Sequence, residues 1–463
     1  MNFKHFLNIE WCLLLSCSVL GCATFEQSAR QSHHLAPVDE HMLDQVKSIN
    51  EEVNPDNLRH SIDGYLEYAA LRNPALQSAF AKWKAALERI PQAKSLPDPK
   101  FNYGYYIQEV ETRVGPQNQR VGLAQTFPWF GTLSLKEGKA ADEARMAQKQ
   151  YDSVKVRLFY QVKDAYYEYY YLRRAIEITQ ENIELLKRLE SVAQAKVRAG
   201  GDSGAVVKAQ VEIGKLEDRL KSLQDFRSPV VAKLNATMGL PSEELLPWPG
   251  DFQATNTPLD KVALLQWLDD TNPDIQSLEL QVKANEKAIQ LARKKFYPDV
   301  TLGVDYISTG DGSAPVLSDR GKDPIMAMFS INIPVWNRKN RAGLREAKSQ
   351  REASEYALED AENRLASELE MAWFAFQDAE RKRDLYRNTL TPLAENSLKV
   401  AQESYESGRS DFLEWIDAQR LLLEFQLSYE RALVDREQSL AGIEQIVGQE
   451  MTSVSIRQQK EAL

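Results

Sequence analysis

Histidine and cysteine are nearly absent from this chain of 463 residues. All five histidines and all three cysteines lie within the first 60 residues: His5, Cys12, Cys17, Cys22, His33, His34, His41 and His60. The rest of the chain therefore holds no serine–histidine triad, no cysteine nucleophile and no zinc site made of histidine or cysteine. The sequence predicts no cofactor and no metal site, and an enzyme acting through paired carboxylates is the weaker hypothesis.

An excess of positive charge is also missing. The chain has 57 lysines and arginines against 67 aspartates and glutamates, which gives a formal net charge of −10. Proteins that bind nucleic acids normally present a basic surface, so the sequence predicts no nucleic-acid partner. The hydrophobic fraction of 43% is ordinary for a globular protein and argues against wholesale disorder.

The apolar stretch near the N-terminus is short. Residues 11–20 are too few to span a bilayer as a helix, but they suit the core of a signal peptide. The following Val19-Leu20-Gly21-Cys22 resembles a bacterial lipobox, which implies cleavage before Cys22 and lipid attachment to it, and Ala23 points to the outer membrane. We predict a signal peptide over 1–21 and a lipidated, extended segment over 22–60. The alternative is an ordinary secretion signal with a chance cysteine.

Several sequence features recur in order at a nearly constant spacing. Asn73-Pro74 recurs as Asn272-Pro273 after 199 residues, Phe127-Pro128 corresponds to Ile333-Pro334 after 206, and Gly200 to Gly408 after 208. An ordered series of this kind is typical of a tandem duplication. We predict a first repeat over 61–240, a linker over 241–259, a second repeat over 260–449 and a C-terminal tail over 450–463.

Each repeat is predicted to hold a helix followed by a β-hairpin. The first helix covers about 61–95, and the hairpins cover about 101–127 and 300–333. Phe101, Tyr103 and Tyr105, for example, alternate with more polar or smaller neighbours. Alternation with a period of two indicates strands with one apolar and one polar face.

Long helices are predicted after both hairpins. The ranges of about 132–199 and 338–407 would each extend about 100 Å. Both end in a glycine ahead of N-cap candidates, Gly200 before Asp202 or Ser203 and Gly408 before Ser410 or Asp411. This order predicts reversals into return helices over about 203–238 and 410–449. A tyrosine-rich stretch within 160–171 is predicted to pack at an interface of the assembled helices, with a stacking platform as the alternative.

Four strands per chain are too few to close a membrane barrel, which needs at least about eight. An open sheet in lipid would leave the backbone groups of its edges without hydrogen bonds. A membrane location therefore requires assembly, with eight strands from two copies or twelve from three. The alternative is a soluble sheet packed on helices.

The second reversal carries the most specific motif. Tyr405-Glu406-Ser407-Gly408 is followed by Leu413 and by Ile416-Asp417-Ala418-Gln419-Arg420, while the first repeat has a degenerate copy with Val197 and Val207-Lys208. With these motifs, the duplication and the order of elements, the chain from about Ser61 to Gly448 resembles the TolC-like outer membrane efflux proteins, in their lipid-anchored branch.

The resemblance implies a mostly α protein with a transmembrane β-barrel part. A homotrimer would form a 12-stranded barrel and an α-helical periplasmic tunnel, anchored by lipid in the outer membrane. Such an exit duct would passively conduct solutes from an inner-membrane pump and a periplasmic adaptor, its partners. The segment 127–131 resembles a signature of relatives that serve metal-exporting pumps. The resemblance therefore favours metal ions as the cargo, with drugs as the other candidate. An exit duct for type I protein secretion and a periplasmic coiled-coil lipoprotein without a pore are the alternatives.

Candidate functional residues follow from strand alternation and from the resemblance. The barrel would be lined by the polar strand face: Asn102, Gly104, Gln108, Thr126, Thr301, Asp305, Ser330 and Asn332. The adaptor would contact the reversals around Gly200, Asp202, Gly408 and Asp411. Lys399 and Gln402 stand where relatives can carry acids, so the nearby Glu403 and Glu406 become the candidate gate, with solvated surface as their other interpretation.

Overall fold

A computed structural model of the protein describes residues 61–200, 203–252, 259–311 and 321–451. The chain divides into two units at Pro55, and every described residue belongs to the second unit. The predicted signal peptide, the lipobox with Cys22 and the candidate tip residue Asp202 lie outside the described residues.

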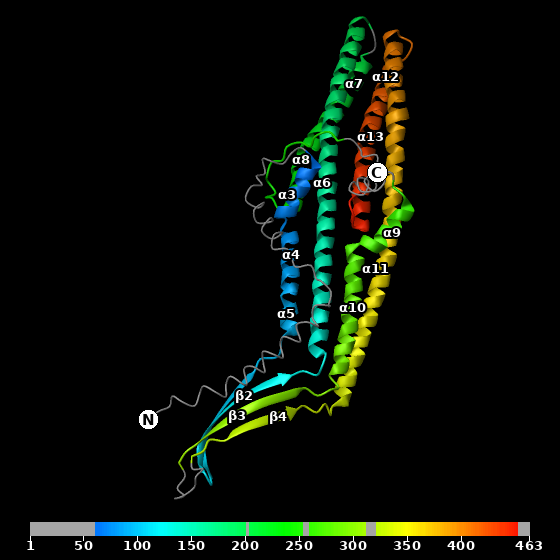
Figure 1. The fold of residues 1–463 in the computed structure, drawn as a ribbon. Helices are drawn as coiled ribbons and strands as arrows, with labels where there is room; N and C mark the ends of the chain where they lie inside the picture. The colour runs from blue at the N-terminus through cyan, green and yellow to red at the C-terminus, as the bar shows by residue number, and fades with distance from the viewer. Residues whose placement is uncertain (1–60, 201–202, 253–258, 312–320, 452–463) are drawn as a thin grey trace, which may run out of the picture. The chain divides into compact units, whose positions relative to one another are not determined.

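The first repeat is mainly helical, with one hairpin (Figure 1). Its elements are α3 (Ile62–Arg72), α4 (Pro74–Leu87), α5 (Arg89–Lys94), β1 (Lys100–Thr112), β2 (Gly115–Phe127), α6 (Thr132–Arg198), α7 (Gly204–Asp225) and α8 (Arg227–Met238).

The second repeat follows the same general order of helix, hairpin, long helix and return helix, with two helices instead of three before its hairpin. It comprises α9 (Lys261–Thr271), α10 (Pro273–Lys294), β3 (Val300–Thr309), β4 (Ile325–Ile331), α11 (Asn337–Leu385), a π-helical turn η3 (Tyr386–Leu390), α12 (Thr391–Glu406) and α13 (Phe412–Val447).

The recurring Asn-Pro pair has a structural cause that is the same in both repeats. Asn73 is extended and its side chain accepts hydrogen bonds from the backbone N–H groups of Ala75 and Leu76, so it ends α3 and caps α4. Asn272 likewise caps α10. Proline fits the first position of a helix because its missing N–H has no intrahelical acceptor there. The single helix expected over about 61–95 is therefore broken at Asn73, and again near Glu88.

The same pair also joins the start of each repeat to its end. The Asn73 side-chain amide donates to the carbonyl of Thr237 at 2.8 Å, and that of Asn272 donates to the carbonyl of Ile446 at 2.7 Å. The first return helix, expected as one helix over about 203–238, is divided into α7 and α8 at Phe226. The last helix of each repeat, α8 or α13, thus ends against the beginning of its own repeat.

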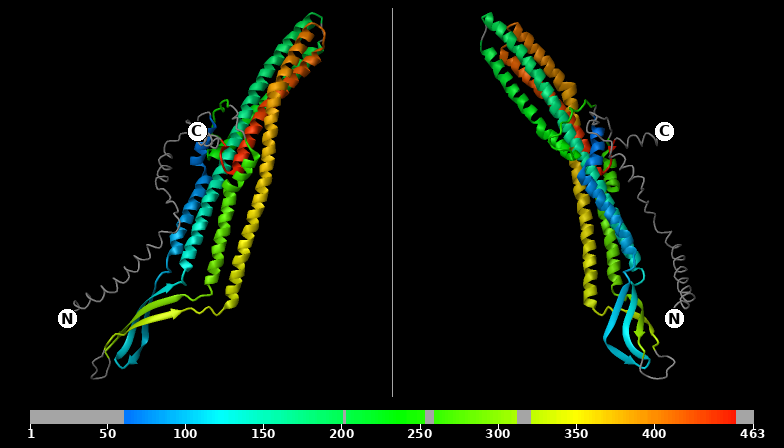
Figure 2. Two further views of the ribbon diagram at one scale, coloured as in Figure 1. Left: turned by 45° about the vertical axis from the view of Figure 1, so that its right-hand side comes forward. Right: turned by 90° about the vertical axis from the view of Figure 1, so that its left-hand side faces the viewer.

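The four strands form one antiparallel sheet in the order β1-β2-β3-β4. The hairpins of the two repeats meet where β2 pairs with β3, and Leu123 lies opposite Phe101 on one side and Val304 on the other. The sheet lies at one end of the long helices and the reversals lie at the other (Figures 1 and 2). This confirms a mostly helical fold with four antiparallel strands per chain.

In the helical part, helix α6 joins the two repeats, because it packs against α4 and α7 of its own repeat and against α10 and α13 of the other. Ion pairs cross between α6 and α13, with Arg174 to Glu430 at 2.9 Å and Glu168 to Arg431 at 2.8 Å. Burial raises the pKa of the Glu430 carboxyl, and the Arg174 guanidinium opposes that shift. The helical part is thus held by polar contacts as well as by apolar packing.

The second long helix is interrupted by the π-helical turn η3, whereas the sequence predicted one continuous helix. Pro392 explains the interruption, since a proline inside a helix removes one hydrogen bond and its ring clashes with the carbonyl four residues earlier. The wider turn over Tyr386–Leu390 accommodates that ring while α12 continues beyond it.

The tyrosine-rich stretch of α6 packs within the chain. Tyr169 stacks on Trp248 with 4.8 Å between ring centroids, and Tyr170 meets Phe252 edge-on at 4.6 Å. These aromatic contacts dock the linker on α6, and Tyr166, Tyr169 and Tyr170 are buried. The prediction that this stretch packs at an interface of the assembled helices missed this role.

Among the described residues, no helix has the length and apolarity needed to cross a membrane.

Candidate channel-lining face and helical tips

The polar face of the sheet gathers several of the predicted lining residues. Asn102 lies opposite Gly122, and Gly122 lies opposite Asp305, so these three residues form one row across β1, β2 and β3. In another row the hydroxyls of Thr126 and Thr301 are hydrogen-bonded at 2.9 Å. Strand alternation therefore places these residues on one face.

Two of the candidates are placed differently. Gln108 lies where the register of β1 shifts between Tyr105 and Val110, so strand alternation does not fix the side that it faces. Asn332 follows the last residue of β4, and its side-chain oxygen accepts a hydrogen bond from the backbone N–H of Asp299. Asn332 thus closes the end of the β3–β4 pair.

Asp305 is buried, with 2% of its surface exposed, and it is ion-paired to Arg120 at 2.5 Å. A Cβ atom at Gly122 would lie only 2.0 Å from the Asp305 carboxylate oxygen. The carboxylate therefore occupies the space that Gly122 leaves free. Arg120 was not among the predicted lining residues, because its proximity to Asp305 depends on the register between β2 and β3, which the sequence does not specify.

The opposite face of the sheet is apolar and exposed in the single chain. Its side chains include Phe101, Tyr103, Leu123, Leu302, Val304 and Phe329, each between 50% and 67% exposed. A contiguous apolar face of this kind normally lies against lipid or another protein.

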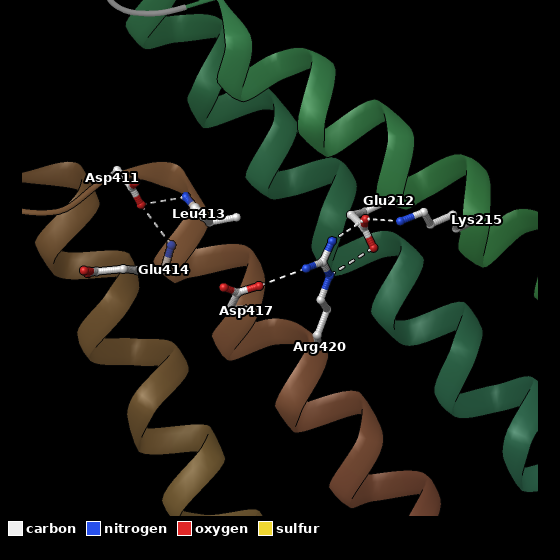
Figure 3. Close-up of polar contacts among 7 residues, drawn as sticks. All are labelled: Glu212, Lys215, Asp411, Leu413, Glu414, Asp417 and Arg420. Atoms are coloured by element: carbon white, nitrogen blue, oxygen red, sulfur yellow. Dashed lines mark hydrogen bonds and ion pairs between the residues drawn. The ribbon is translucent and has the colours of Figure 1, made fainter.

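The predicted glycines stand at both reversals. Gly200 and Gly408 have φ angles of 96° and 73°, a left-handed conformation that glycine adopts without steric cost. The carboxylate of Asp411 accepts hydrogen bonds from the N–H groups of Leu413 at 2.9 Å and Glu414 at 3.1 Å, and so caps α13 (Figure 3).

The candidate gate residues Glu403 and Glu406 are exposed on α12 near the second reversal. Glu406 accepts a hydrogen bond from the Gln402 side chain at 2.9 Å. Tyr405, between them, is buried with Phe412 and Trp415 in an aromatic cluster, and the Lys196 ammonium lies 3.9 Å from the centre of its ring.

The helices α7 and α13, which follow the two reversals, are joined by a cluster of charged side chains. Arg420 of α13 lies 2.5 Å from the Glu212 carboxylate of α7 and 2.9 Å from Asp417, and Lys215 also reaches Glu212 at 2.8 Å (Figure 3). The hydrogen bond from Arg420 lowers the pKa of Glu212, with a further contribution from Lys215. The sequence shows Arg420 only as part of a motif, because nothing in the sequence links it to Glu212.

No group of three or more histidine, cysteine, aspartate or glutamate side chains that could hold a metal occurs in the described part of the chain. The described residues therefore form a sheet with one polar and one apolar face, and two helical reversals, of which the second is capped by the Asp411 side chain.

Comparison with known proteins identifies the family. The model of the outer membrane efflux protein family matches residues 65–235 and 264–449, which together are most of the chain. The chain belongs to the outer membrane efflux protein family. The two matched segments correspond to the two repeats, and the chain is accordingly an outer membrane efflux protein rather than an enzyme.

Individual relatives have low sequence identity to this chain, but they align with most of its length. The pyoverdine export outer membrane protein OpmQ of Pseudomonas putida is 23% identical over 69% of this chain and 67% of its own length. The cobalt-zinc-cadmium resistance protein CzcC of Cupriavidus metallidurans is 21% identical over 84% of this chain and 90% of its own. The solved outer-membrane channel OprN is 19% identical and covers 84% of this efflux protein and 90% of its own chain, with a TM-score of 0.71. OprN therefore shares the fold.

Proposed function

We propose that three copies of this chain form the exit duct of a tripartite efflux system in the outer membrane. The observation that carries the proposal is the sheet, with its exposed apolar face, its polar face and its edge strands β1 and β4. Edge strands in lipid must pair, because unpaired backbone groups there are costly. Three copies supply twelve strands, which is enough for a closed barrel with a water-filled interior.

The remaining parts of the proposal concern the anchor and the partners. Acyl chains on Cys22 would hold the N-terminus at the membrane. The reversals around Gly200, Asp202, Gly408 and Asp411 would dock the periplasmic adaptor, which delivers solutes from the inner-membrane pump. Solutes would then pass through passively. Metal ions and drugs are the cargoes we favour, and the similarity to CzcC, a cobalt-zinc-cadmium resistance protein, supports the first.

The native mass of the mature protein, extracted in gentle detergent with its lipid attached, tests this proposal first. We expect a mass close to three chains and, after reconstitution into a planar bilayer, a stepwise ionic conductance. A monomer that stays soluble without detergent would overturn the duct and favour a periplasmic spacer. A pore current that is blocked by a protein substrate in transit, but not by metal ions or drugs, would favour a secretion duct.

The gate is tested separately. We propose that Glu403 and Glu406, exposed near the tip of α12, form rings of carboxylates in the trimer and bind cations there. Replacing both with glutamine should reduce the block of the pore by periplasmic divalent cations, because the negative charge that attracts them is removed. Glu395 to glutamine, also exposed on α12, is the control. An unchanged closed conductance and cation block in the double variant would remove the gate from the proposal.

A further inference from the structure

A hollow lies where the sheet meets the helices. It has a volume of about 850 Å³ and is lined by residues of α6, α10, α11 and the strand ends. Thr126 is among the lining residues, and its hydroxyl meets that of Thr301 on the polar face of the sheet. Asn332 also lines the hollow. The hollow therefore opens on the side of the sheet that a barrel turns inward.

Positive charge dominates this hollow, although the whole chain has a net charge of −10. The charged lining residues are Lys136, Lys139, Lys294, Lys295 and Lys339 against Asp299 and Glu346. The Asp299 carboxylate is engaged by the backbone N–H of Trp129 at 3.0 Å. The hollow is therefore locally basic in a chain whose net charge is negative.

Some of these lysines already have partners. Lys139 is paired with Glu143, and the Lys294 ammonium donates to the carbonyl of Phe130 at 2.9 Å. Lys136, Lys295 and Lys339 are exposed, and their ammonium groups form no ion pair with a carboxylate within the described ranges. Three exposed ammonium groups beside one hollow are available to a ligand.

We propose that this hollow is a binding site for solutes with two or more carboxylate or phosphate groups as they pass toward the barrel. The inference rests on the proposed duct and narrows its cargo. Positive side chains at the wall of a narrow passage raise the local concentration of anions and lower that of cations. Three copies of the chain repeat the site around the passage. A free divalent metal ion is then disfavoured at this level, whereas an organic anion or a metal held in an anionic complex is favoured.

The experiment uses the full lipidated trimer in planar bilayers, with citrate as the anionic probe and potassium chloride at about 0.05 M to limit screening. We expect citrate to reduce the current of the unmodified pore. The variant Lys136→Gln/Lys295→Gln/Lys339→Gln should raise the half-blocking citrate concentration roughly tenfold, since the opposite charges that hold the probe are lost. The matched control is Lys82→Gln/Lys208→Gln/Lys221→Gln, which removes the same charge from exposed positions away from the hollow.

The outcomes separate this inference from the duct itself. A wild-type trimer without any conductance would overturn the duct. A conducting pore that citrate does not block, or blocks equally in both triple variants, would overturn the site alone. Lipid headgroups offer the same phosphate chemistry, so bilayers with and without phosphatidylglycerol are compared. If the three lysines govern retention of phosphatidylglycerol during purification but not citrate block, the hollow faces lipid and the proposal fails.

Discussion

Single glycines set how closely neighbouring elements approach in this protein. At Gly122 the missing side chain leaves room for the Asp305 carboxylate, which reaches past the backbone to Arg120. Gly104 lies on the same face, but a Cβ there would meet its nearest neighbour at 3.9 Å, an ordinary contact. The two glycines look alike in the sequence, and only the register across the sheet separates them.

We expect Gly122→Ala to weaken the sheet by about 1–3 kcal/mol, because the new methyl group must push a buried carboxylate away from its cation. Gly104→Ala should change stability by less than about 0.5 kcal/mol. The measurement is the temperature at which the detergent-purified oligomer dissociates. Equal dissociation temperatures for the two variants would show that the Asp305 carboxylate does not occupy this space.

A second glycine prediction concerns the repeat ends. Gly448 has a φ of 80°, and a Cβ there would lie 2.7 Å from the Pro273 ring and 2.9 Å from the Thr271 carbonyl. Gly448→Ala should therefore cost about 2 kcal/mol or more through strain and clash. Gly214→Ala is the control, since it lies in open space within α7 and alanine favours helix there by up to about 1 kcal/mol. Thermal unfolding followed by circular dichroism would reveal the opposite signs, and a stabilised Gly448→Ala would contradict the packing described.

At the scale of elements, the tie between α7 and α13 depends on ionisation. The pKa of Glu212 is lowered mainly by its hydrogen bond from Arg420. A carboxyl group with a lowered pKa in the folded state contributes stability above its ordinary value of 4.5, and this contribution is lost as the pH falls through the lower, folded value.

Glu212→Gln should therefore lower the unfolding temperature at pH 7, by an amount equivalent to about 1 kcal/mol, and the difference from the unmodified protein should shrink below about pH 4. Asp417→Asn removes the more exposed partner of the same guanidinium and should have a smaller effect. Thermal unfolding from pH 7 to pH 3.5 measures both. A deficit in Glu212→Gln that stays constant across this range would mean that the ionised pair with Arg420 is not the cause of the deficit.

The sequence predicted those elements whose signal is local. Alternation identified both hairpins, long runs without proline identified the long helices, and Gly200 and Gly408 marked the reversals at which the structure gives left-handed backbone. It could not predict the pairing of Arg120 with Asp305 or of Arg420 with Glu212, because both join residues about 200 positions apart whose register is set by packing. The π-helical turn was missed although Pro392 was visible, since proline alone does not say whether a helix stops, kinks or widens.

At the scale of the whole molecule, the two faces of the sheet should respond oppositely to charge. Val304 lies on the exposed apolar face and Asn102 on the polar face. If the apolar face meets lipid, Val304→Arg carries an energetic penalty of about 2–4 kcal/mol near the bilayer centre for each copy, whereas Asn102→Arg meets water. We expect Val304→Arg to reduce the amount of assembled trimer in outer membrane fractions severalfold, and Asn102→Arg to leave assembly intact while changing the ion selectivity of the pore. Native gels of detergent extracts measure the first effect and planar-bilayer reversal potentials the second. Equal losses of trimer from both variants, or normal assembly of Val304→Arg, would mean that this sheet does not lie in lipid and would remove the barrel from the proposed duct.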